Sequence, residues 1–123
     1  MNKVLEKRNN TISKFQLQVY FFCSQIPKGY FTTYKYLAKA LKTSPRAIGK
    51  ALKNNPFCPE PVPCHRIIAN NFYLGGYKGE WGQGENLIIK RKILKKEGLI
   101  FNKSNYLLKE LRNKIVKEFN FTI

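Results

Sequence analysis

The sequence predicts one mainly α-helical domain, a winged-helix-like helix-turn-helix with short strands around a loop rich in proline and glycine. Several observations favour this fold. Apolar residues recur at helical spacing, two of the helical segments are short and separated by a tight turn, and residues 56–82 carry prolines and glycines that exclude a long helix. The chain has 123 residues, of which 43% are hydrophobic, which suits a single domain with a substantial core.

The first helix is expected over residues 13–25, after a basic tail formed by residues 1–11. Its apolar positions follow helical spacing at Phe15, Val19, Phe22, Cys23 and Ile26. Because Cys23 belongs to this stripe, we interpret it as a small core residue and not as a reactive thiol. The Pro-Lys-Gly sequence at 27–29 is expected to end the helix.

Residues 32–54 predict the helix-turn-helix. Thr32-Thr33 offers an N-cap for a first short helix, whose apolar residues are Tyr34, Leu37, Ala38 and Leu41. Ser44 and Pro45 then provide the N-cap and the first-turn proline of a second helix that ends near Asn54. The inward residues of this second helix are Ile48, Ala51 and Leu52.

The second of these helices combines a basic residue with small ones: Arg46, Ala47, Gly49 and Ala51. Small side chains let a backbone approach DNA closely, which suits a recognition helix. Ordinary close packing between helices explains the same residues equally well at this point.

The segment after the helix-turn-helix is expected to form ordered loops, with extended pieces at residues 66–69 and 72–74 and a tight turn at Asn70-Asn71. A helix over Glu85–Lys96 follows, with Ile89, Ile93 and Leu94 turned inward. Glu97 falls on that inward face, where a carboxylate needs a partner. Residues 101–123 predict a final amphipathic helix packed on the domain, from the spacing of Leu108, Leu111, Ile115 and Phe119.

Charge indicates the partner. Lys and Arg total 23 against 7 acidic residues, which gives a formal net charge of +16. A surplus of this size favours a polyanion, with nucleic acid first and an anionic membrane surface second. A lysine-rich proteome is the plain alternative, although such a bias usually raises Glu together with Lys.

Composition also suggests the compartment. No run of about 18 apolar residues is present, so no membrane span is expected. The opening MNKVLEKRNN lacks the apolar core of a secretory signal. The 3 cysteines are an odd number without a pairing pattern, which favours a reducing, cytoplasmic setting. With 1 histidine in the chain, we expect neither a tetrahedral metal site nor a cofactor.

Cys64 is the strongest candidate for chemistry. Pro63 fixes the backbone before it, and the chain's single histidine, His65, follows it directly, with Arg66 next. A nucleophilic cysteine needs a thiolate, and therefore a base or a positive environment. Adjacent side chains in extended backbone point apart, so His65 is expected to act through a water. For an arbitrary Cys-His pair a buried structural cysteine is the usual explanation, but this pair lies in a constrained loop after the helix-turn-helix.

These residues belong to segments that resemble a known family. Val62-Pro63-Cys64-His65-Arg66-Ile67-Ile68 is similar to the Pro-Cys-His-Arg-Val active-site motif of the O6-alkylguanine-DNA alkyltransferases. Four further segments resemble the family's Ser-Tyr-x-x-Leu-Ala segment, its recognition helix with the Asn-Pro after it, and its Gly-x-Tyr and His-Glu-Gly segments: Thr33–Ala38, Arg46–Pro56, Gly75-Gly76-Tyr77 and Lys96-Glu97-Gly98. The resemblance runs from about Phe15 to Leu99 in the family's order. It implies a DNA repair protein, with residues 12–100 as the catalytic and DNA-binding domain.

The resemblance also implies a role for each matching residue. Cys64 would accept the alkyl group of O6-alkylguanine irreversibly, as a single-turnover cysteine S-methyltransferase, with His65 as its water-mediated base. Glu97 would hold His65, and Tyr34 would donate a proton to the departing guanine. The partner would be double-stranded DNA, bound in the minor groove by a monomer with the damaged nucleotide flipped out and Arg46 in the gap. The remaining implied contacts are Thr33, Ala47, Gly49 and Lys50 at the DNA, and Asn55, Arg66 and Tyr77 around the loop and pocket.

Other functional classes remain open from the sequence. A non-catalytic alkyl-lesion binder of the same fold is the nearest alternative, but such relatives lack the cysteine that Cys64 supplies. A helix-turn-helix regulator that senses alkylation would need a partner domain or dimer surface, and the sequence indicates none. A cysteine protease is disfavoured, because its histidine is usually distant in sequence.

Overall fold

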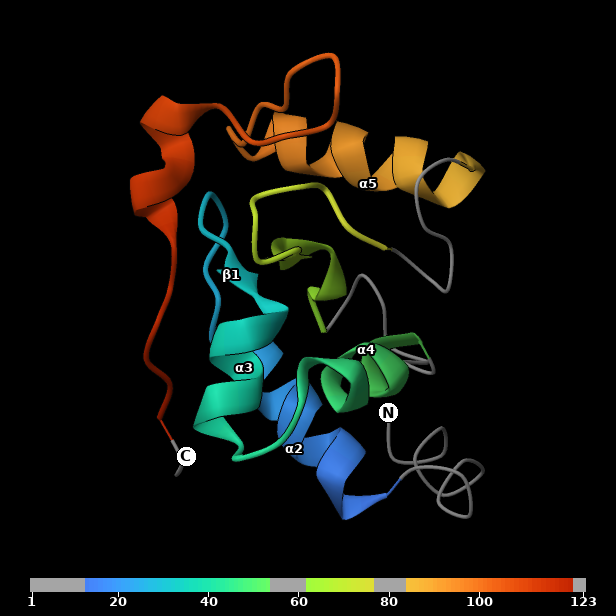
Figure 1. Cartoon of the computed structure of the whole chain (residues 1–123), viewed down its shortest axis with the longest axis vertical. Helices are drawn as coiled ribbons and strands as arrows, with labels where there is room; N and C mark the ends of the chain where they lie inside the picture. Colours follow the sequence, from blue (N-terminus) through green and yellow to red (C-terminus); the bar gives the residue numbers. More distant parts are fainter. Residues whose placement is uncertain (1–12, 54–61, 77–83, 121–123) are drawn as a thin grey trace.

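The computed structural model describes residues 13–53, 62–76 and 84–120 (Figure 1). Its elements are α2 (Lys14–Cys23), β1 (Thr32–Thr33), α3 (Tyr34–Ala40), α4 (Pro45–Lys53), the 3₁₀ helix η1 (Cys64–Arg66), β2 (Ile67–Ile68), α5 (Glu85–Lys96) and the 3₁₀ helix η2 (Lys109–Lys114). The mainly helical fold with short strands is the one that the sequence predicts. Within the described ranges, no helix combines the length and the apolar character that crossing a membrane requires.

The first three helices form one packed unit, and their caps explain where they begin. Ser13 and Gln16 form a reciprocal capping box at the start of α2. The side chains of Thr33 and Ser44 accept from backbone N–H groups in the first turns of α3 and α4. Cys23 is fully buried, as expected, and burial raises the pKa of its thiol to about 12. The predicted helix-turn-helix is therefore confirmed as α3 and α4.

A short parallel sheet connects the helix-turn-helix to the motif loop. Thr32 pairs with Ile67 and Thr33 with Ile68, so β1 and β2 run side by side. The extended piece expected at 66–69 is thus partly confirmed, because Arg66 still belongs to η1 and the strand begins at Ile67. The pairing places the start of α3 next to the segment that leaves η1, although the two are distant in sequence.

The helix expected over Glu85–Lys96 is present as α5, and Leu94 is buried as predicted, but the rest of the inward face differs from the predicted one. The buried residues are Leu87, Lys90 and Leu94, whereas Ile89 is 38% exposed. The prediction assumed that apolar side chains define the buried face. Here a lysine occupies the core because backbone carbonyls of other segments accept its protons.

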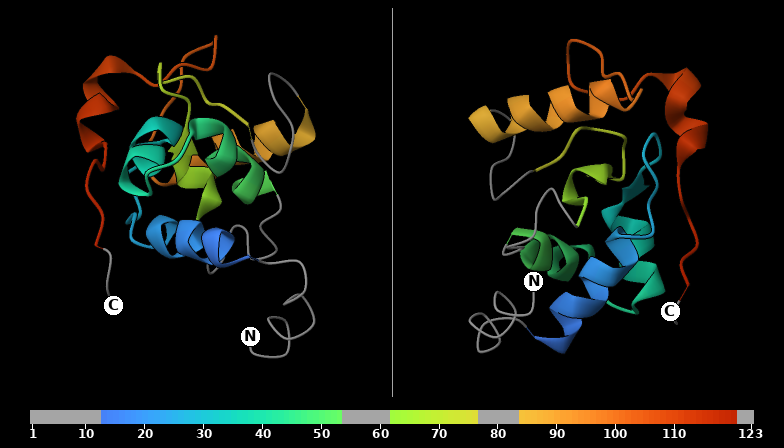
Figure 2. Two further views of the ribbon diagram at one scale, coloured as in Figure 1. Left: turned by 60° about the horizontal axis from the view of Figure 1, so that its bottom comes forward. Right: turned by 180° about the vertical axis from the view of Figure 1, so that it is seen from behind.

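The prediction of a final amphipathic helix in the C-terminal segment is wrong. Residues 109–114 form η2, Ile115 is extended, and residues 116–120 belong to no helix. Val116 donates its N–H to the carbonyl of Phe31 at 2.6 Å, and Phe31 donates to the carbonyl of Lys114 at 3.2 Å. β-Branched Ile115 and Val116 favour this strand-like pairing over a helix. Figures 1 and 2 show this segment running along the side of α3 that is remote from α4.

Candidate active site

The Cys-His-Arg sequence forms η1, a single tight turn that follows the Pro63 backbone. Cys64 and His65 are both buried, with exposed fractions of 6% and 3%. The sulfur of Cys64 is disulfide-bonded in the structure, so the thiolate that a nucleophile requires is the form that exists after reduction. The turn brings His65 and Arg66 to the same side, facing the end of α5.

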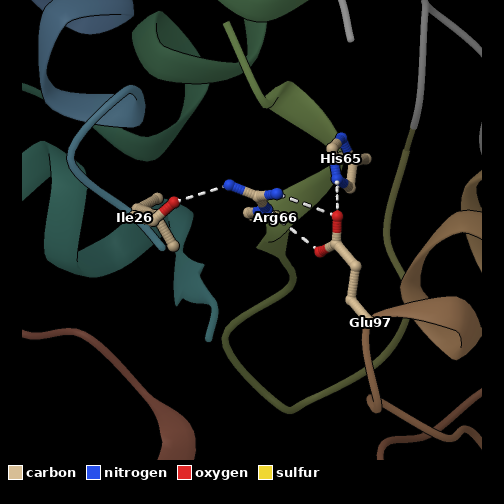
Figure 3. A network of polar contacts seen from close by, with 4 residues as sticks. All are labelled: Ile26, His65, Arg66 and Glu97. Atoms are coloured by element: carbon tan, nitrogen blue, oxygen red, sulfur yellow. Dashed lines mark hydrogen bonds and ion pairs between the residues drawn. The ribbon is translucent and has the colours of Figure 1, made fainter. Parts of the chain in front are cut away.

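Glu97, the C-cap residue of α5, joins both of these side chains (Figure 3). Nε2 of His65 lies 2.9 Å from Oε2 of Glu97. Arg66 donates from Nε to Oε1 at 3.0 Å and from Nη2 to Oε2 at 2.9 Å, a two-pronged ion pair. Arg66 also donates from Nη1 to the carbonyl of Ile26 at 2.8 Å, which ties the network to the end of α2. The structure therefore brings together His65 and Glu97 directly after Cys64, and adds Arg66 as a second residue that binds the carboxylate.

The charges in this network favour a neutral imidazole and an ionised carboxylate. Burial lowers the pKa of His65, and the hydrogen bond to Glu97 offsets part of that effect. Burial raises the pKa of Glu97, but the hydrogen bonds from Arg66 and His65 outweigh it, so the net shift is downward. Near neutral pH the carboxylate accepts hydrogen bonds, and neutral His65 donates its Nε2 proton to it.

The second ring nitrogen of His65 then carries a lone pair. Nδ1 is buried, and no hydrogen-bond partner for it is found among the described residues. When Nε2 holds the proton, Nδ1 is an acceptor and can take a proton from a nearby acid. This tautomer is what a base next to Cys64 requires.

Tyr34 is the first residue of α3, directly after β1, and is 9% exposed. Burial raises the pKa of its phenol well above the usual value of 10.0, and a hydrogen bond with the backbone of Gly76 offsets part of this. Gly75 packs tightly beside it: a Cβ there would lie 3.6 Å from Cε2 of Tyr34 and 3.2 Å from the backbone nitrogen of Ala69. Tyr34 thus stays protonated at neutral pH, and Gly75 allows the backbone to approach its ring.

The expected DNA-contacting residues divide into two groups. Arg46 and Lys50 are exposed on α4, and Ala47 and Gly49 are half-buried between them. A Cβ on Gly49 would meet nothing within 4 Å, so helix packing does not require this glycine. Thr33, in contrast, is 2% exposed and caps α3, which favours a structural role over the DNA contact expected for it. The expected residues Asn55 and Tyr77 lie outside the described ranges.

Two features of the site were not predicted from the sequence: the ion pair of Arg66 with Glu97 and the burial of Lys90. The resemblance implies a place near the pocket for the Arg66 side chain, whereas its guanidinium donates hydrogen bonds to Glu97 and to the carbonyl of Ile26. Lys90 lies seven residues before Glu97, which places both on one face of α5. Because the sequence predicts that Glu97 faces inward, this spacing indicates that Lys90 faces inward too.

Comparison with known proteins gives one family. The model of the 6-O-methylguanine DNA methyltransferase DNA-binding domain matches residues 14–99. A methylated-DNA–protein-cysteine methyltransferase of Archaeoglobus fulgidus is 39% identical over 87 residues, which cover 71% of this chain and 58% of that protein. One of Pyrobaculum aerophilum is 44% identical over 75 residues, covering 61% of this chain and 46% of that protein. The chain spans about half the length of these curated relatives.

Solved structures agree on the fold. The O6-methylguanine-DNA methyltransferase of the archaeon Pyrococcus kodakaraensis superposes with a TM-score of 0.61 at 38% identity, covering 72% of this chain and 48% of that one. Mycobacterium tuberculosis OGT in complex with DNA gives a TM-score of 0.61 at 32% identity, covering 70% of this chain and 49% of that one. The S. pombe ATL protein in complex with DNA has a TM-score of 0.64 at 24% identity over 85% of this chain and 96% of that one, which is a similarity of fold alone.

Proposed function

Because this chain belongs to the 6-O-methylguanine DNA methyltransferase family, we propose that it repairs DNA by moving an alkyl group from O6-alkylguanine to Cys64. The observation that carries this proposal is the Cys64-His65-Glu97 arrangement, in which Glu97 lies 2.9 Å from one imidazole nitrogen and the other nitrogen is left as a buried acceptor. The partners proposed for it are double-stranded DNA and, as substrate, a guanine alkylated at O6.

The reaction follows from the groups at hand. Reduced Cys64 loses its thiol proton to Nδ1 of His65, directly or through a water, and Glu97 stabilises the imidazolium that forms. The thiolate attacks the alkyl carbon, a C–S bond forms, and the bond between that carbon and O6 breaks. The electron pair of the broken bond stays on guanine, which takes a proton from Tyr34. The proton that His65 took from the thiol then returns through solvent to the Tyr34 phenolate, so both side chains end neutral. A thioether does not release its alkyl group under these conditions, so the protein acts once.

The DNA-binding surface proposed is the exposed face of α4. Arg46 and Lys50 supply positive charge there, and Gly49 leaves room for a close backbone approach. Cys64 is buried, so a base stacked inside a duplex cannot reach it. The nucleotide must therefore leave the stack, and we assign Arg46 to the gap it leaves, from the minor-groove side. Extrusion costs a few kcal/mol, which phosphate contacts offset in part.

The test is transfer to the reduced full chain. After incubation with an oligonucleotide that carries O6-methylguanine, mass spectrometry should show one added methylene mass on the peptide that contains Cys64. The peptide with Cys23, a fully buried thiol, is the internal control and should stay unmodified. Cys64→Ser should still bind DNA and accept no methyl group. Transfer that persists in Cys64→Ser would remove Cys64 from the mechanism.

The same experiment separates the alternative. A non-catalytic lesion binder would hold the methylated oligonucleotide more tightly than the unmethylated one and gain no mass. That result with reduced wild-type protein would replace the repair proposal by damage recognition.

A further inference from the structure

A side chain in the turn after β2 reaches the beginning of α3 and has no part in the reaction described above. Asn70 is an exposed residue of this turn, and its Oδ1 accepts the backbone N–H of Lys35 at 2.9 Å. Lys35 is the second residue of α3 and directly follows Tyr34. The hydrogen bond therefore joins segments 35 residues apart, next to a residue with a proposed role in the reaction.

The bond supplies an acceptor that the helix cannot provide for itself. The first N–H groups of a helix have no carbonyl partner within it. In α3 the local cap is Thr33, whose side chain accepts the N–H of Tyr36 at 3.4 Å. The N–H of Lys35 goes to Asn70 at the shorter distance of 2.9 Å. Caps usually come from the residue just before a helix, whereas a cap from a distant turn also connects the helix to that turn.

The turn that carries Asn70 is itself held in one conformation. Phe72 donates its N–H to the carbonyl of Ala69, and Ala69 donates to the carbonyl of Tyr73, both at 3.0 Å. Phe72 has a φ of 69°, a left-handed conformation that a bulky residue adopts only where its surroundings enforce it. Arg112 is part of these surroundings, because its guanidinium carbon lies 4.6 Å from the centre of the Phe72 ring. The turn therefore presents the Asn70 side chain from a fixed backbone.

Two attachments to one segment lie on either side of Tyr34. Before it, Thr33 pairs with Ile68 in the parallel sheet. After it, Lys35 binds Asn70, which lies two residues beyond Ile68. The sheet has only two residues in each strand, so it places β1 but leaves the direction of α3 less constrained. A second attachment beyond Tyr34 constrains that direction.

The segment bound at both points is the one that leaves the Cys64 turn through β2. Building on the proposed function, we propose that Asn70 is a positioning residue for alkyl transfer: it holds the start of α3, and with it Tyr34, in a fixed relation to the segment that follows Cys64. The Tyr34 phenol has to reach the departing guanine while the sulfur reaches the alkyl carbon. An error in their relative placement therefore slows the reaction.

This bond should influence geometry far more than stability. Asn70 and Lys35 are both exposed, so a water can accept the Lys35 N–H when the side chain is removed. A water satisfies the helix but does not connect it to the turn. Asn70→Ala should therefore fold with a urea midpoint close to that of wild type, which allows its rate constant to be measured.

The experiment is a single-turnover reaction of the reduced full chain with two substrates, O6-methylguanine in duplex DNA and free O6-benzylguanine. Asn70→Ala is compared with wild type and with Asn113→Ala, a matched control at an exposed asparagine of η2. We expect the rate constant of Asn70→Ala to fall at least about fivefold with both substrates, because misplaced reacting groups react slowly. Its affinity for duplex DNA should stay unchanged, and Asn113→Ala should match wild type throughout.

Two results with Asn70→Ala would overturn the proposal. One is a folded protein with the wild-type rate constant. The other is a loss confined to duplex DNA, which would indicate that Asn70 contacts the DNA and does not position Tyr34. If wild type itself accepts no methyl group, the proposed function fails; if wild type reacts and Asn70→Ala reacts equally fast, this inference alone fails.

Asn70→Asp is the rescue variant. Its carboxylate can accept the same N–H and is favoured at the N-terminus of a helix. With free O6-benzylguanine, where no DNA phosphate repels the added charge, it should react at close to the wild-type rate near neutral pH. Asn70→Asp that folds and reacts as slowly as Asn70→Ala would contradict the proposal.

A double-mutant cycle tests whether Asn70 acts through Tyr34. In Tyr34→Phe the phenol that donates a proton is absent, so the loss of Asn70 has no donor left to misplace. We expect Asn70→Ala to slow the Tyr34→Phe protein by less than about twofold, because mutations that affect one interaction are not additive. The full loss in the Tyr34→Phe background would place the effect elsewhere and reject the proposal.

Hydrogen exchange at the backbone amide of Lys35 tests the bond itself, and wild type alone suffices if a variant does not fold. Amides at exposed helix ends usually exchange fast. The Lys35 amide should nevertheless be protected in wild type and in Asn70→Asp, and lose this protection in Asn70→Ala. An unprotected Lys35 amide in wild type would remove the attachment on which the inference rests.

Discussion

At the level of single residues, Glu97 shows how one carboxylate serves a basic and a structural partner together. It receives hydrogen bonds from His65 and Arg66, and Arg66 extends the connection to the carbonyl of Ile26. The inward position of Glu97 was predictable from helical spacing, but it belongs with Leu87, Lys90 and Leu94 and not with the isoleucines. The spacing from Glu97 places Lys90 on this face, but the sequence does not distinguish a lysine bound by remote backbone carbonyls from an exposed one, so the burial of Lys90 could not be predicted.

Glu97 should make the stability of the protein depend on acid. Its pKa is lowered in the folded state from 4.5, so its contribution is complete above that pH and is lost as the pH falls through the folded value. Glu97→Gln should lose about 1–3 kcal/mol at pH 7, the range for hydrogen bonds to a buried charged group. The difference from wild type should shrink below pH 4.5. Urea unfolding between pH 3 and 7.5 measures both effects.

His65 also makes the free energy of unfolding rise with pH, in a higher pH range than Glu97 does. Its folded pKa lies below 6.5, so its stabilisation is present above 6.5 and declines as the pH falls from there.

Glu110→Gln, which changes an exposed carboxylate in η2, is the control for Glu97→Gln and should follow wild type throughout. A constant difference between Glu97→Gln and wild type across the whole range would show that the charge of Glu97 is not what stabilises the site.

At the level of elements, α4 and its caps were predictable because their signals are local. Ser44, Pro45 and the apolar residues of the helix are close in sequence, and each acts within one or two turns. The parallel pairing of β1 with β2 was not predictable, because it joins segments more than 30 residues apart and each strand has only two residues. In the C-terminal segment, local spacing predicted a helix that does not form, because Ile115 and Val116 pair with the distant residue Phe31.

Arg46 on α4 should matter for duplex DNA and not for the chemical step. Arg46→Ala should slow repair of O6-methylguanine in a duplex at least about tenfold, because the few kcal/mol needed to extrude the base are no longer offset by a side chain in the gap. Its reaction with free O6-benzylguanine should stay within about twofold of wild type. Lys39→Ala removes an exposed charge from α3 and serves as the control. Equal losses with both substrates would reject the role assigned to Arg46.

The C-terminal segment should stabilise the first strand. A chain that ends at Leu108 keeps Phe101 and Leu107 in the core but lacks the bonds of Lys114 and Val116 to Phe31 and Thr32. It also loses the stacking of Phe119 on Phe22, at 5.5 Å between ring centres. At about 1 kcal/mol for each hydrogen bond, we expect a loss of several kcal/mol in the free energy of unfolding. An unchanged midpoint in urea would mean that this segment packs without stabilising the domain.

At the level of the whole molecule, the charge balance predicts how binding responds to salt. A formal net charge of +16 on 123 residues provides many lysines and arginines for phosphates. With about four to six phosphate contacts, affinity for duplex DNA should fall about 10²–10³-fold between 50 and 200 mM salt. The reaction with uncharged O6-benzylguanine should hardly change over the same range. A flat DNA response would show that the positive charge serves another purpose.

The pairing of β1 with β2 has a consequence for the order in which parts of the chain fold. The helices α2, α3 and α4 are formed by neighbouring parts of the sequence, whereas β1, which precedes Tyr34, pairs with β2, which follows the Cys64 turn, only when a long loop closes. During refolding, affinity for DNA should thus return before the capacity to accept an alkyl group, and the delay between them would time the last step of assembly.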